Sequence, residues 1–387
     1  MGASGEPAAA GHGLMARAPA QLDGEELPEA DRLEGFPHPR ETHTLRGHDA
    51  AEQALAQAFA AGRMHHAWLI AGNAGIGKAT LAYRLARHVL AKSGERDPTG
   101  QRLEVAEETS AARQIRARSH PGLLVLRRPY DPRSKRFAAS IPVDEVRRLR
   151  SFLGLTAGEG SWRVVIVDAV DELNVSAANA LLKSLEEPPA RAVFLLVASE
   201  PNRLLPTIRS RTRRLDLQPL APEPLRQATE AALAAARMEV PSAEQWRLLE
   251  RLAEGSVRRA LQLAGSGGLD LYERIGGFLA RLPSVDWSAV HTLSDQLALP
   301  AQEQRFEAFF DLLLDLLARL VRARAGGASD APESVLAGKL IAEDRVPAWA
   351  AAWEEIVRER ADAELLNLDK KALVLATFAR LEALARR

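Results

Sequence analysis

The segment GNAGIGKAT, residues 72–80, has the residue types and the spacing of a phosphate-binding loop. The pattern G-x-x-x-x-G-K starts at Gly72 and reaches its second glycine and its lysine at Gly77 and Lys78. In such loops the backbone N–H groups surround phosphate oxygens, and the lysine contacts the terminal phosphates of a nucleotide. The segment therefore predicts a site for nucleotide phosphates.

Two groups that nucleotide hydrolysis normally requires are missing from their expected positions. The residue after the lysine usually has a hydroxyl that binds Mg²⁺, but it is Ala79 here, and the first hydroxyl is that of Thr80. The apolar run WRVVIVD ends in Asp168, at the place of the acid that helps to hold Mg²⁺. The next residue, where many such ATPases have a water-activating glutamate, is Ala169. We therefore expect the loop to bind a nucleotide without turnover.

The elements on either side of the loop follow from hydrophobic periodicity. Residues 66–72, HAWLIAG, form a short apolar run that is typical of a buried parallel strand. Residues 78–94 have apolar side chains on one helical face, and Gly94 is the predicted end of that helix. The loop thus lies between a strand and a helix N-terminus, where backbone N–H groups face an anion.

Strands alternate with helices as far as residue 220, which predicts a parallel sheet covered by helices on both faces. Further strands are expected at 162–168, 192–199 and 212–220, helices at 48–63, 141–154 and 176–189, and a short helix or turn at 203–211. The Arg-rich stretch 111–136 is interpreted as a solvated loop, with contact to DNA or a partner as the alternative. Asp171 and Glu172 are likewise interpreted as solvated loop acids.

After Pro219 the pattern is wholly helical, and GSGG at 265–268 indicates a linker. The apolar segment FEAFFDLLLDLLARLV, residues 306–321, is predicted to be either an oligomer contact or the internal core of the last domain. The predicted organisation is a disordered extension at 1–38, a nucleotide-binding core at 39–218, a helical lid at 219–268 and a helical oligomerisation domain at 269–387.

Composition excludes several classes of protein. The 387 residues have a formal net charge of zero, so the chain is not expected to coat nucleic acid unaided. There is no cysteine, which excludes disulfides and thiolate zinc sites, and no metal site is predicted. The N-terminus lacks the pattern of a signal peptide, and no run of eighteen apolar residues occurs, so we expect a cytoplasmic protein without a membrane span.

A longer stretch resembles a known family. The string NALLKSLEEPP followed by the SR of LLPTIRSR is similar to the clamp-loader branch of the AAA+ ATPases, and within it to the delta-prime subunits of bacterial DNA polymerase III. HHAWLIAGNAGIGKATLAYRLAR and GSVRRAL fit the same family. The resemblance covers roughly residues 43–268, with weaker support at 365–381. It implies a RecA-like αβα core, a helical lid and a C-terminal helical collar.

The resemblance also implies roles for particular residues. The SRC motif of the family is SRT here, so Arg211 matches the arginine finger, which reaches the ATP of a neighbouring subunit. Arg258, in GSVRRAL, matches the second sensor arginine, with a contact between lid and core as the alternative, and Ser199 lies near the first sensor position. The predicted catalytic residue is Arg211, acting in trans, and the predicted nucleotide-binding residues are Gly72, Gly75, Gly77, Lys78, Ala79, Thr80, Asp168 and Arg258.

The function implied by the resemblance is that of a stator-like clamp-loader subunit. Such a subunit binds the clamp-loader ATPase (tau/gamma) subunits and the delta subunit, and the assembled complex loads the sliding clamp on primed DNA. ATP or ADP would be bound without turnover, and the four-cysteine zinc module of many relatives is absent or metal-free. The alternatives are a catalytically active motor subunit of the same loader and another AAA+ ATPase of DNA replication or repair.

Overall fold

A five-stranded parallel sheet forms the centre of the N-terminal lobe in the computed structural model, which describes residues 27–154, 161–265, 267–326, 332–366 and 368–386. In sheet order the strands are β2 (Leu123–Leu126), β5 (Arg163–Asp168), β6 (Ala192–Ala198), β1 (Ala67–Ala71) and β7 (Arg213–Asp216). Every residue of the two central strands β6 and β1 is buried, because helices cover both faces of the sheet. The predicted α/β fold class is confirmed.

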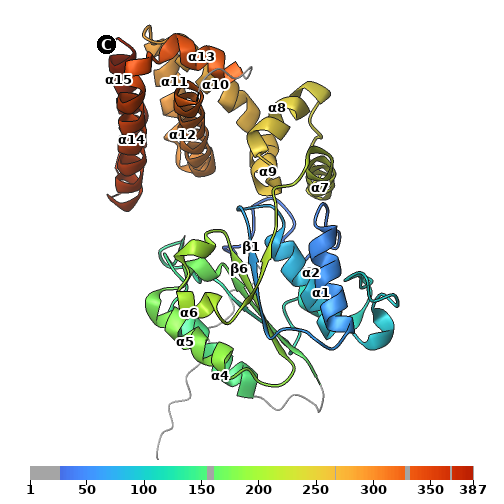
Figure 1. Cartoon of the computed structure of the whole chain (residues 1–387). Helices are drawn as coiled ribbons and strands as arrows, with labels where there is room; N and C mark the ends of the chain where they lie inside the picture. The colour runs from blue at the N-terminus through green and yellow to red at the C-terminus, as the bar shows by residue number, and fades with distance from the viewer. Residues whose placement is uncertain (1–26, 155–160, 266, 327–331, 367, 387) are drawn as a thin grey trace, which may run out of the picture.

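Alternate side chains of β1 enter two separate cores, as the period of a strand requires. Trp68 and Ile70 point to the face covered by α1 (Asp49–Ala60) and α2 (Lys78–Leu90), whereas Ala67 and Leu69 point to the opposite face. The opposite face is covered by α4 (Val143–Gly154), α5 (Val175–Glu186) and α6 (Pro206–Arg209) (Figure 1). The helix α2, which follows the predicted phosphate loop, therefore lies on the other side of the sheet from α5 and α6.

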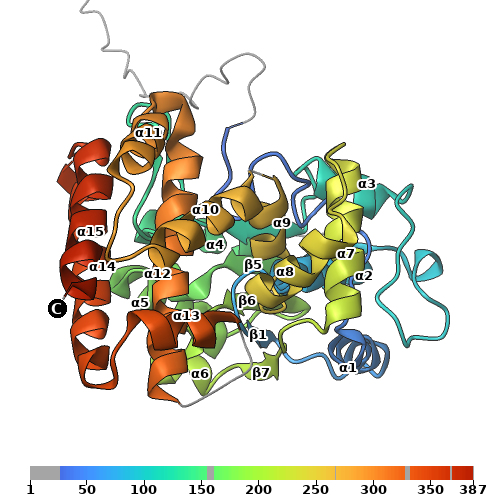
Figure 2. The same ribbon diagram turned by 90° about the horizontal axis from the view of Figure 1, so that it is seen from above.

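Helices alone form the second lobe, above the sheet in Figure 1. They are α7 (Pro222–Ala235), α8 (Ala243–Ala253), α9 (Val257–Gly265), α10 (Gly268–Ala280), α11 (Trp287–Leu297), α12 (Glu303–Ala325), α13 (Pro332–Leu340), α14 (Val346–Leu366) and α15 (Lys370–Ala385). Figure 2, seen from above, shows α14 and α15 side by side at the end of the lobe away from α7. No helix in the described ranges is both long and apolar enough to cross a membrane.

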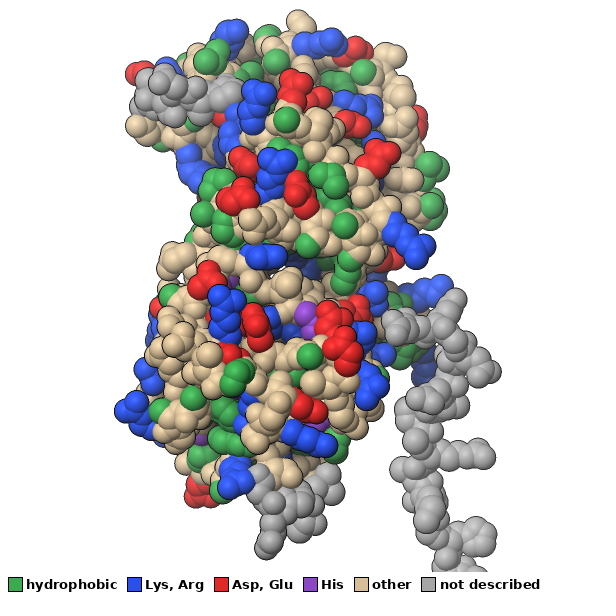
Figure 3. All heavy atoms as spheres, turned by 90° about the vertical axis from the view of Figure 1, so that its right-hand side faces the viewer, with side chains coloured by type: hydrophobic (Ala, Val, Ile, Leu, Met, Phe, Trp, Pro, Cys, Tyr) green, Lys and Arg blue, Asp and Glu red, His purple; other side chains and the backbone are tan. Residues whose placement is uncertain are grey.

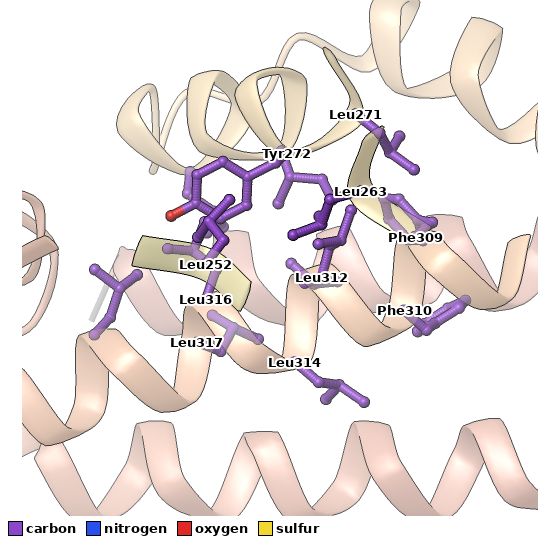
Figure 4. Close-up of a cluster of buried hydrophobic side chains, with 14 of the residues drawn as sticks. Leu252, Leu263, Leu271, Tyr272, Phe309, Phe310, Leu312, Leu314, Leu316 and Leu317 are labelled. Carbon is purple, nitrogen blue, oxygen red and sulfur yellow. The ribbon is translucent and has the colours of Figure 1, made fainter. Parts of the chain in front are cut away.

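One continuous apolar core joins α8 and α9 to α10 and α12. Leu252, Leu263, Tyr272 and Leu316 point toward one another between these helices (Figure 4). Gly265 ends α9 and the buried Gly268 begins α10, so the predicted linker at 265–268 coincides with the short connection between these two helices. The apolar side chains at the junction require the two pairs of helices to pack together.

The apolar segment of α12 is the internal core of this lobe. Phe309, Phe310, Leu313 and Leu317 are at most 2% exposed, and α10, α13 and α14 pack around the helix. Full burial of each such side chain stabilises the fold by roughly 1.5–3 kcal/mol. Of the two predicted roles for this segment, the structure supports the internal core.

The stretch 111–136 is folded rather than a solvated loop, so that prediction is wrong. It contains most of α3 (Ser110–Arg116), the edge strand β2, and a short antiparallel pair formed by β3 (Tyr130–Asp131) and β4 (Arg136–Phe137). The physical reason is the apolar run LLVL, which pairs in register with β5 and places Leu124 and Leu126 in the core. The helix α2 also ends earlier than predicted, at Leu90.

Two acidic side chains of the N-terminal segment are buried among basic groups. Glu29 pairs with Arg127 and, at 3.0 Å, with Arg118 Nη1. Asp31 Oδ1 lies 2.8 Å from Arg127 Nη1, and Asp31 Oδ2 lies 3.0 Å from His38 Nε2. Burial raises the pKa of Asp31, but the contact with His38 and the charges of His38 and Arg127 outweigh it and lower the pKa to about 2.

An apolar contact attaches the same segment to the helical lobe. Phe36 is 7% exposed and packs against Leu233 of α7 and Leu261 of α9. The prediction of a disordered extension to residue 38 is therefore wrong for 27–38, which ion pairs and this aromatic contact hold in place. Residues 1–26 lie outside the described part of the chain.

We predict that Asp31→Asn lowers the free energy of unfolding at pH 7 by about 2 kcal/mol, which corresponds to the shift of the Asp31 pKa from 3.8 to about 2. Because the folded-state pKa is depressed, this stabilisation is present above pH 4 and is lost as the pH falls toward 2. Urea unfolding at pH 7 and pH 3 measures it. Glu108→Gln, at an exposed acid, is the control, and equal effects of the two variants at pH 7 would contradict the assignment.

Candidate nucleotide-binding site

The predicted phosphate loop connects the end of β1 to the first turn of α2, at the top of the sheet. Gly72, Gly75 and Gly77 all have positive φ angles, of 145°, 77° and 108°, which favour glycine. A Cβ atom on Gly75 would lie 2.4 Å from Arg258 Cβ, and one on Gly72 would lie 2.5 Å from the carbonyl oxygen of Leu217. Glycine is therefore required at both positions for close approach of neighbouring segments.

The ammonium group of Lys78 is turned into the loop. Its Nζ donates hydrogen bonds to the carbonyl oxygens of Gly72 at 2.7 Å and Asn73 at 2.6 Å, and to Ser199 Oγ at 3.1 Å. The side chain is only 5% exposed, and burial lowers its pKa to about 8, against the opposing effect of nearby carboxylates. A phosphate oxygen that binds Lys78 must therefore compete with acceptors from the loop itself.

Asp168 lies at the end of β5, beside the loop. Burial raises its pKa to about 7, with further repulsion from Asp31, while Lys78 and Arg258 act in the opposite direction. At neutral pH this carboxyl group is ionised in only about half of the molecules. Its position at the end of β5, beside Lys78, fits the predicted acid of a nucleotide site.

The interpretation as solvated loop acids is wrong for Asp171, whereas Glu172 is 37% exposed and paired with an arginine. Asp171 Oδ2 accepts hydrogen bonds from the backbone N–H groups of Ser199 at 3.0 Å and Glu200 at 2.8 Å. Glu172 Oε2 accepts a hydrogen bond from Arg128 Nε at 2.9 Å. Asp171 thus ties the turn after β5 to the end of β6, which is a structural use of its carboxylate.

A cavity of about 560 Å³ opens above the loop, between the sheet and helices α7 and α9. The predicted residues that line it are Gly75, Gly77, Lys78, Ala79, Thr80, Asp168 and Arg258. Gly72 does not line the cavity, and its carbonyl oxygen accepts a hydrogen bond from Lys78 instead. The structure therefore places most of the predicted nucleotide-binding residues around one space.

Sequence reasoning missed one wall of this cavity. Residues of the stretch 30–46, among them Asp31, Phe36 and Leu45, line it together with the loop and helices α7 and α9. Figure 3 shows the junction between the two lobes from the α1 side, where acidic and basic side chains are interspersed over the surface. The apolar Leu33 and Phe36, within an otherwise polar stretch, were the available signal that this segment is packed.

The start of α9 is hydrogen-bonded to the phosphate loop. Ser256 Oγ donates to the carbonyl oxygen of Ala74 at 2.9 Å, and the backbone N–H of Arg258 donates to that of Gly75 at 3.2 Å. The alternative interpretation of Arg258 as a contact between lid and core thus describes its backbone, while its side chain lines the cavity. Any movement of the loop on binding phosphate would act directly on α9.

Arg211 lies in a different place, just after α6. Its Nη2 lies 2.9 Å from Glu186 Oε1, and its Nη1 donates to the carbonyl oxygen of Thr207 at 3.0 Å. The side chain is 37% exposed and is not among the described residues that line the cavity. Its guanidinium group thus contacts α5 and α6, on the face of the sheet opposite α2.

If the five strands β1, β2, β5, β6 and β7 are numbered 1 to 5 in chain order, their order across the sheet is 2-3-4-1-5. A phosphate loop follows the first strand, and helices follow the last. These features define a P-loop protein of AAA+ architecture. A family model described as DNA polymerase III, delta subunit, matches residues 47–221. The chain is 33% identical over 267 residues to the DNA polymerase III subunit delta' of Escherichia coli, covering 68% of this chain and 73% of that protein. The chain belongs to the delta-prime family of DNA polymerase III subunits, which confirms the predicted resemblance.

Other relatives are similar over shorter parts of their length. The identity to the DNA polymerase III subunit delta' of Pseudomonas aeruginosa is 39% over 202 residues, which is 52% of this chain and 56% of that protein. The tau subunit of Salmonella typhimurium is 33% identical over 56% of this chain and 31% of its own length. A gamma subunit-related structure from Thermotoga maritima aligns with 20% identity and a TM-score of 0.40, covering 83% of this chain and 95% of that one.

We predict that the affinity for ADP without Mg²⁺ falls about tenfold between pH 7 and pH 9, because Lys78, with a pKa of about 8, loses its charge over this interval. Calorimetric titration of ADP across this range measures the effect. Lys78→Met should bind ADP weakly at every pH. Because the charge of Asp168 raises the pKa of Lys78, the slope should move to lower pH in Asp168→Asn; a slope that persists in Lys78→Met would contradict its assignment to the lysine.

Proposed function

We propose that this chain is a stator-like subunit of the DNA polymerase III clamp loader. It supports ATP-dependent loading of the sliding clamp on primed DNA and supplies an arginine finger to a neighbouring ATP site. Membership of the delta-prime family supports the assignment to the loader. The observation on which the finger depends is the position of Arg211, which is partly exposed beside α6 and is not among the described residues that line the chain's own cavity.

The chain's own site is proposed to hold ATP or ADP without turnover. The loop retains Lys78 and its glycines, but Ala79 and Ala169 stand where a magnesium-binding hydroxyl and a water-activating acid are needed. These features favour a retained binding site over an active motor subunit.

The domains are proposed to follow the clamp-loader plan, with a core at 39–218, a lid at 219–268 and a collar at 269–387 that binds the tau/gamma and delta subunits. Because α8 and α9 share a core with α12, deletion of 269–387 would expose apolar side chains of the lid. Assembly must therefore be tested with the full chain. We predict that it co-elutes with tau and delta in gel filtration; elution of the chain alone from the mixture would contradict the collar assignment.

The purified chain is predicted to have no significant steady-state ATPase activity, since two groups of the hydrolytic site are alanine. A coupled ATPase measurement at saturating Mg²⁺–ATP tests this expectation. Lys78→Ala is the control for contaminating enzymes, because it removes the charge of the loop. Turnover of about 1 s⁻¹ or more that disappears in Lys78→Ala would assign the chain to the motor subunits instead.

Arg211→Ala is predicted to leave the loader assembled and to slow hydrolysis at the neighbouring site. A guanidinium group stabilises negative charge on the transferred phosphoryl group through directed donors, and in GTPases a finger contributes about 10³–10⁵ in rate. Single-turnover hydrolysis, with the other ATP sites inactivated, isolates this site. Arg211→Lys should restore the rate only in part, because an ammonium group lacks the planar arrangement of donors.

The control for this experiment is Arg214→Ala. Arg214 lies three residues away, outside the SRT motif, and pairs with Asp216 at 2.7 Å. If Arg211→Ala and Arg214→Ala lower the neighbouring rate equally, the effect is that of general positive charge and the finger assignment is wrong.

A further inference from the structure

The guanidinium group of Arg211 is held from two sides. Glu186 Oε1 lies 2.9 Å from Nη2, and the carbonyl oxygen of Thr207 accepts a hydrogen bond from Nη1 at 3.0 Å. Glu186 is the last residue of α5, and Thr207 belongs to α6, which packs beside α5 (Figure 1). The arginine therefore bridges two elements that are fixed to the same face of the sheet.

The position of Glu186 has an electrostatic cost that Arg211 offsets. The C-terminal end of a helix has a partial negative charge, so a carboxylate on the last residue of α5 is unfavourable there without a cation. Two prolines, Pro188 and Pro189, follow and prevent the helix from continuing, which fixes the place of this carboxylate. A guanidinium group beside it relieves the repulsion and is itself attracted to the helix end.

The contacts of Arg211 within the chain leave some of its N–H donors free to bind another anion. The group has five N–H donors in one plane; Glu186 occupies one on Nη2, and Thr207 and, at 3.4 Å, Ser210 Oγ accept from Nη1, which leaves Nε and the second donor of Nη2. The side chains of the pair are 37% and 47% exposed, so the remaining donors can reach an anion from outside the chain. A planar group held at two corners presents its other donors in a defined direction.

We propose that Glu186 is a positioning residue for Arg211, which orients the guanidinium group toward the γ-phosphate of the nucleotide bound by the neighbouring subunit. This inference rests on the proposed function of Arg211 as a finger. Glu186 itself does not touch the nucleotide and acts only through the arginine. Restricting the arginine before the subunits meet lowers the entropy that must be lost to reach the reactive geometry.

The adjacent Glu187 provides a matched control. It has the same charge and is exposed at the same helix end, and the described residues include no hydrogen-bond or ion-pair partner for its side chain. An effect of general negative charge near Arg211 would therefore appear in Glu187→Ala as well. An effect through the contact would appear in Glu186→Ala alone.

The test measures single-turnover hydrolysis at the neighbouring site in the assembled loader, with nucleotide affinity at that site measured separately. Glu186→Ala should lower the hydrolysis rate about two- to fivefold, as expected for loss of a partly exposed ion pair, with little change in nucleotide affinity. Glu186→Gln should fall between wild type and Glu186→Ala, because its amide oxygen still accepts a hydrogen bond. Glu187→Ala should match the wild type.

The same measurement in an Arg211→Ala background separates the two claims. Glu186→Ala should have no further effect there, since it acts through the arginine. If Arg211→Ala lowers the rate but Glu186→Ala does not, or raises it, the positioning role is wrong while the finger stands. If Glu186→Ala is equally harmful in both backgrounds, its role is structural and the inference is overturned. If Arg211→Ala itself has no effect, the proposed finger and this inference both fail.

Discussion

Burial of the Lys78 charge is the constraint on which the centre of this molecule depends. A cation that is 5% exposed must have acceptors and negative charge nearby, and its neighbours come from three segments of the chain. The loop after β1 contributes the carbonyls of Gly72 and Asn73, the end of β6 contributes Ser199, and β5 contributes Asp168. These partners can meet only if β5, β6 and β1 are adjacent and parallel, with their carboxyl ends at one edge.

The phosphate loop also has contacts with the helical lobe. Ser256 and the backbone of Arg258 are hydrogen-bonded to the loop carbonyls, so the loop connects the sheet to α9. The helix α9 in turn shares its core with α12. We infer that the loop has a structural use in joining the two lobes, in addition to its proposed affinity for phosphate.

The sequence predicted the parts of the fold whose signals are local. The strands β1, β5 and β6 are continuous apolar runs, which sheets covered on both faces require, and GNAGIGKAT has a fixed spacing. The strand β2 was missed because its four apolar residues lie in an Arg-rich stretch. Residues 27–38 are held in place by contacts of Glu29 and Asp31 with Arg127, which is nearly a hundred positions away. No local sequence pattern could reveal contacts at this separation.

The sequence named residues of the candidate site, but it could not predict their pKa values. Spacing and resemblance identified Lys78, Asp168 and Arg258, which the structure places around one cavity. The pKa values of about 8 for Lys78 and about 7 for Asp168 follow from burial, which arises only when the elements pack. The contact of Arg211 with Glu186 likewise depends on the packing of α6 against α5.

We propose that Arg211 acts on a nucleotide held by another subunit, and a structure of the assembled loader with a non-hydrolysable ATP analogue is the decisive test. In that structure the guanidinium group of Arg211 should lie within hydrogen-bond distance of the γ-phosphate analogue in the neighbouring site. A structure in which the neighbouring analogue is bound and Arg211 remains more than about 5 Å from every phosphate oxygen would contradict it.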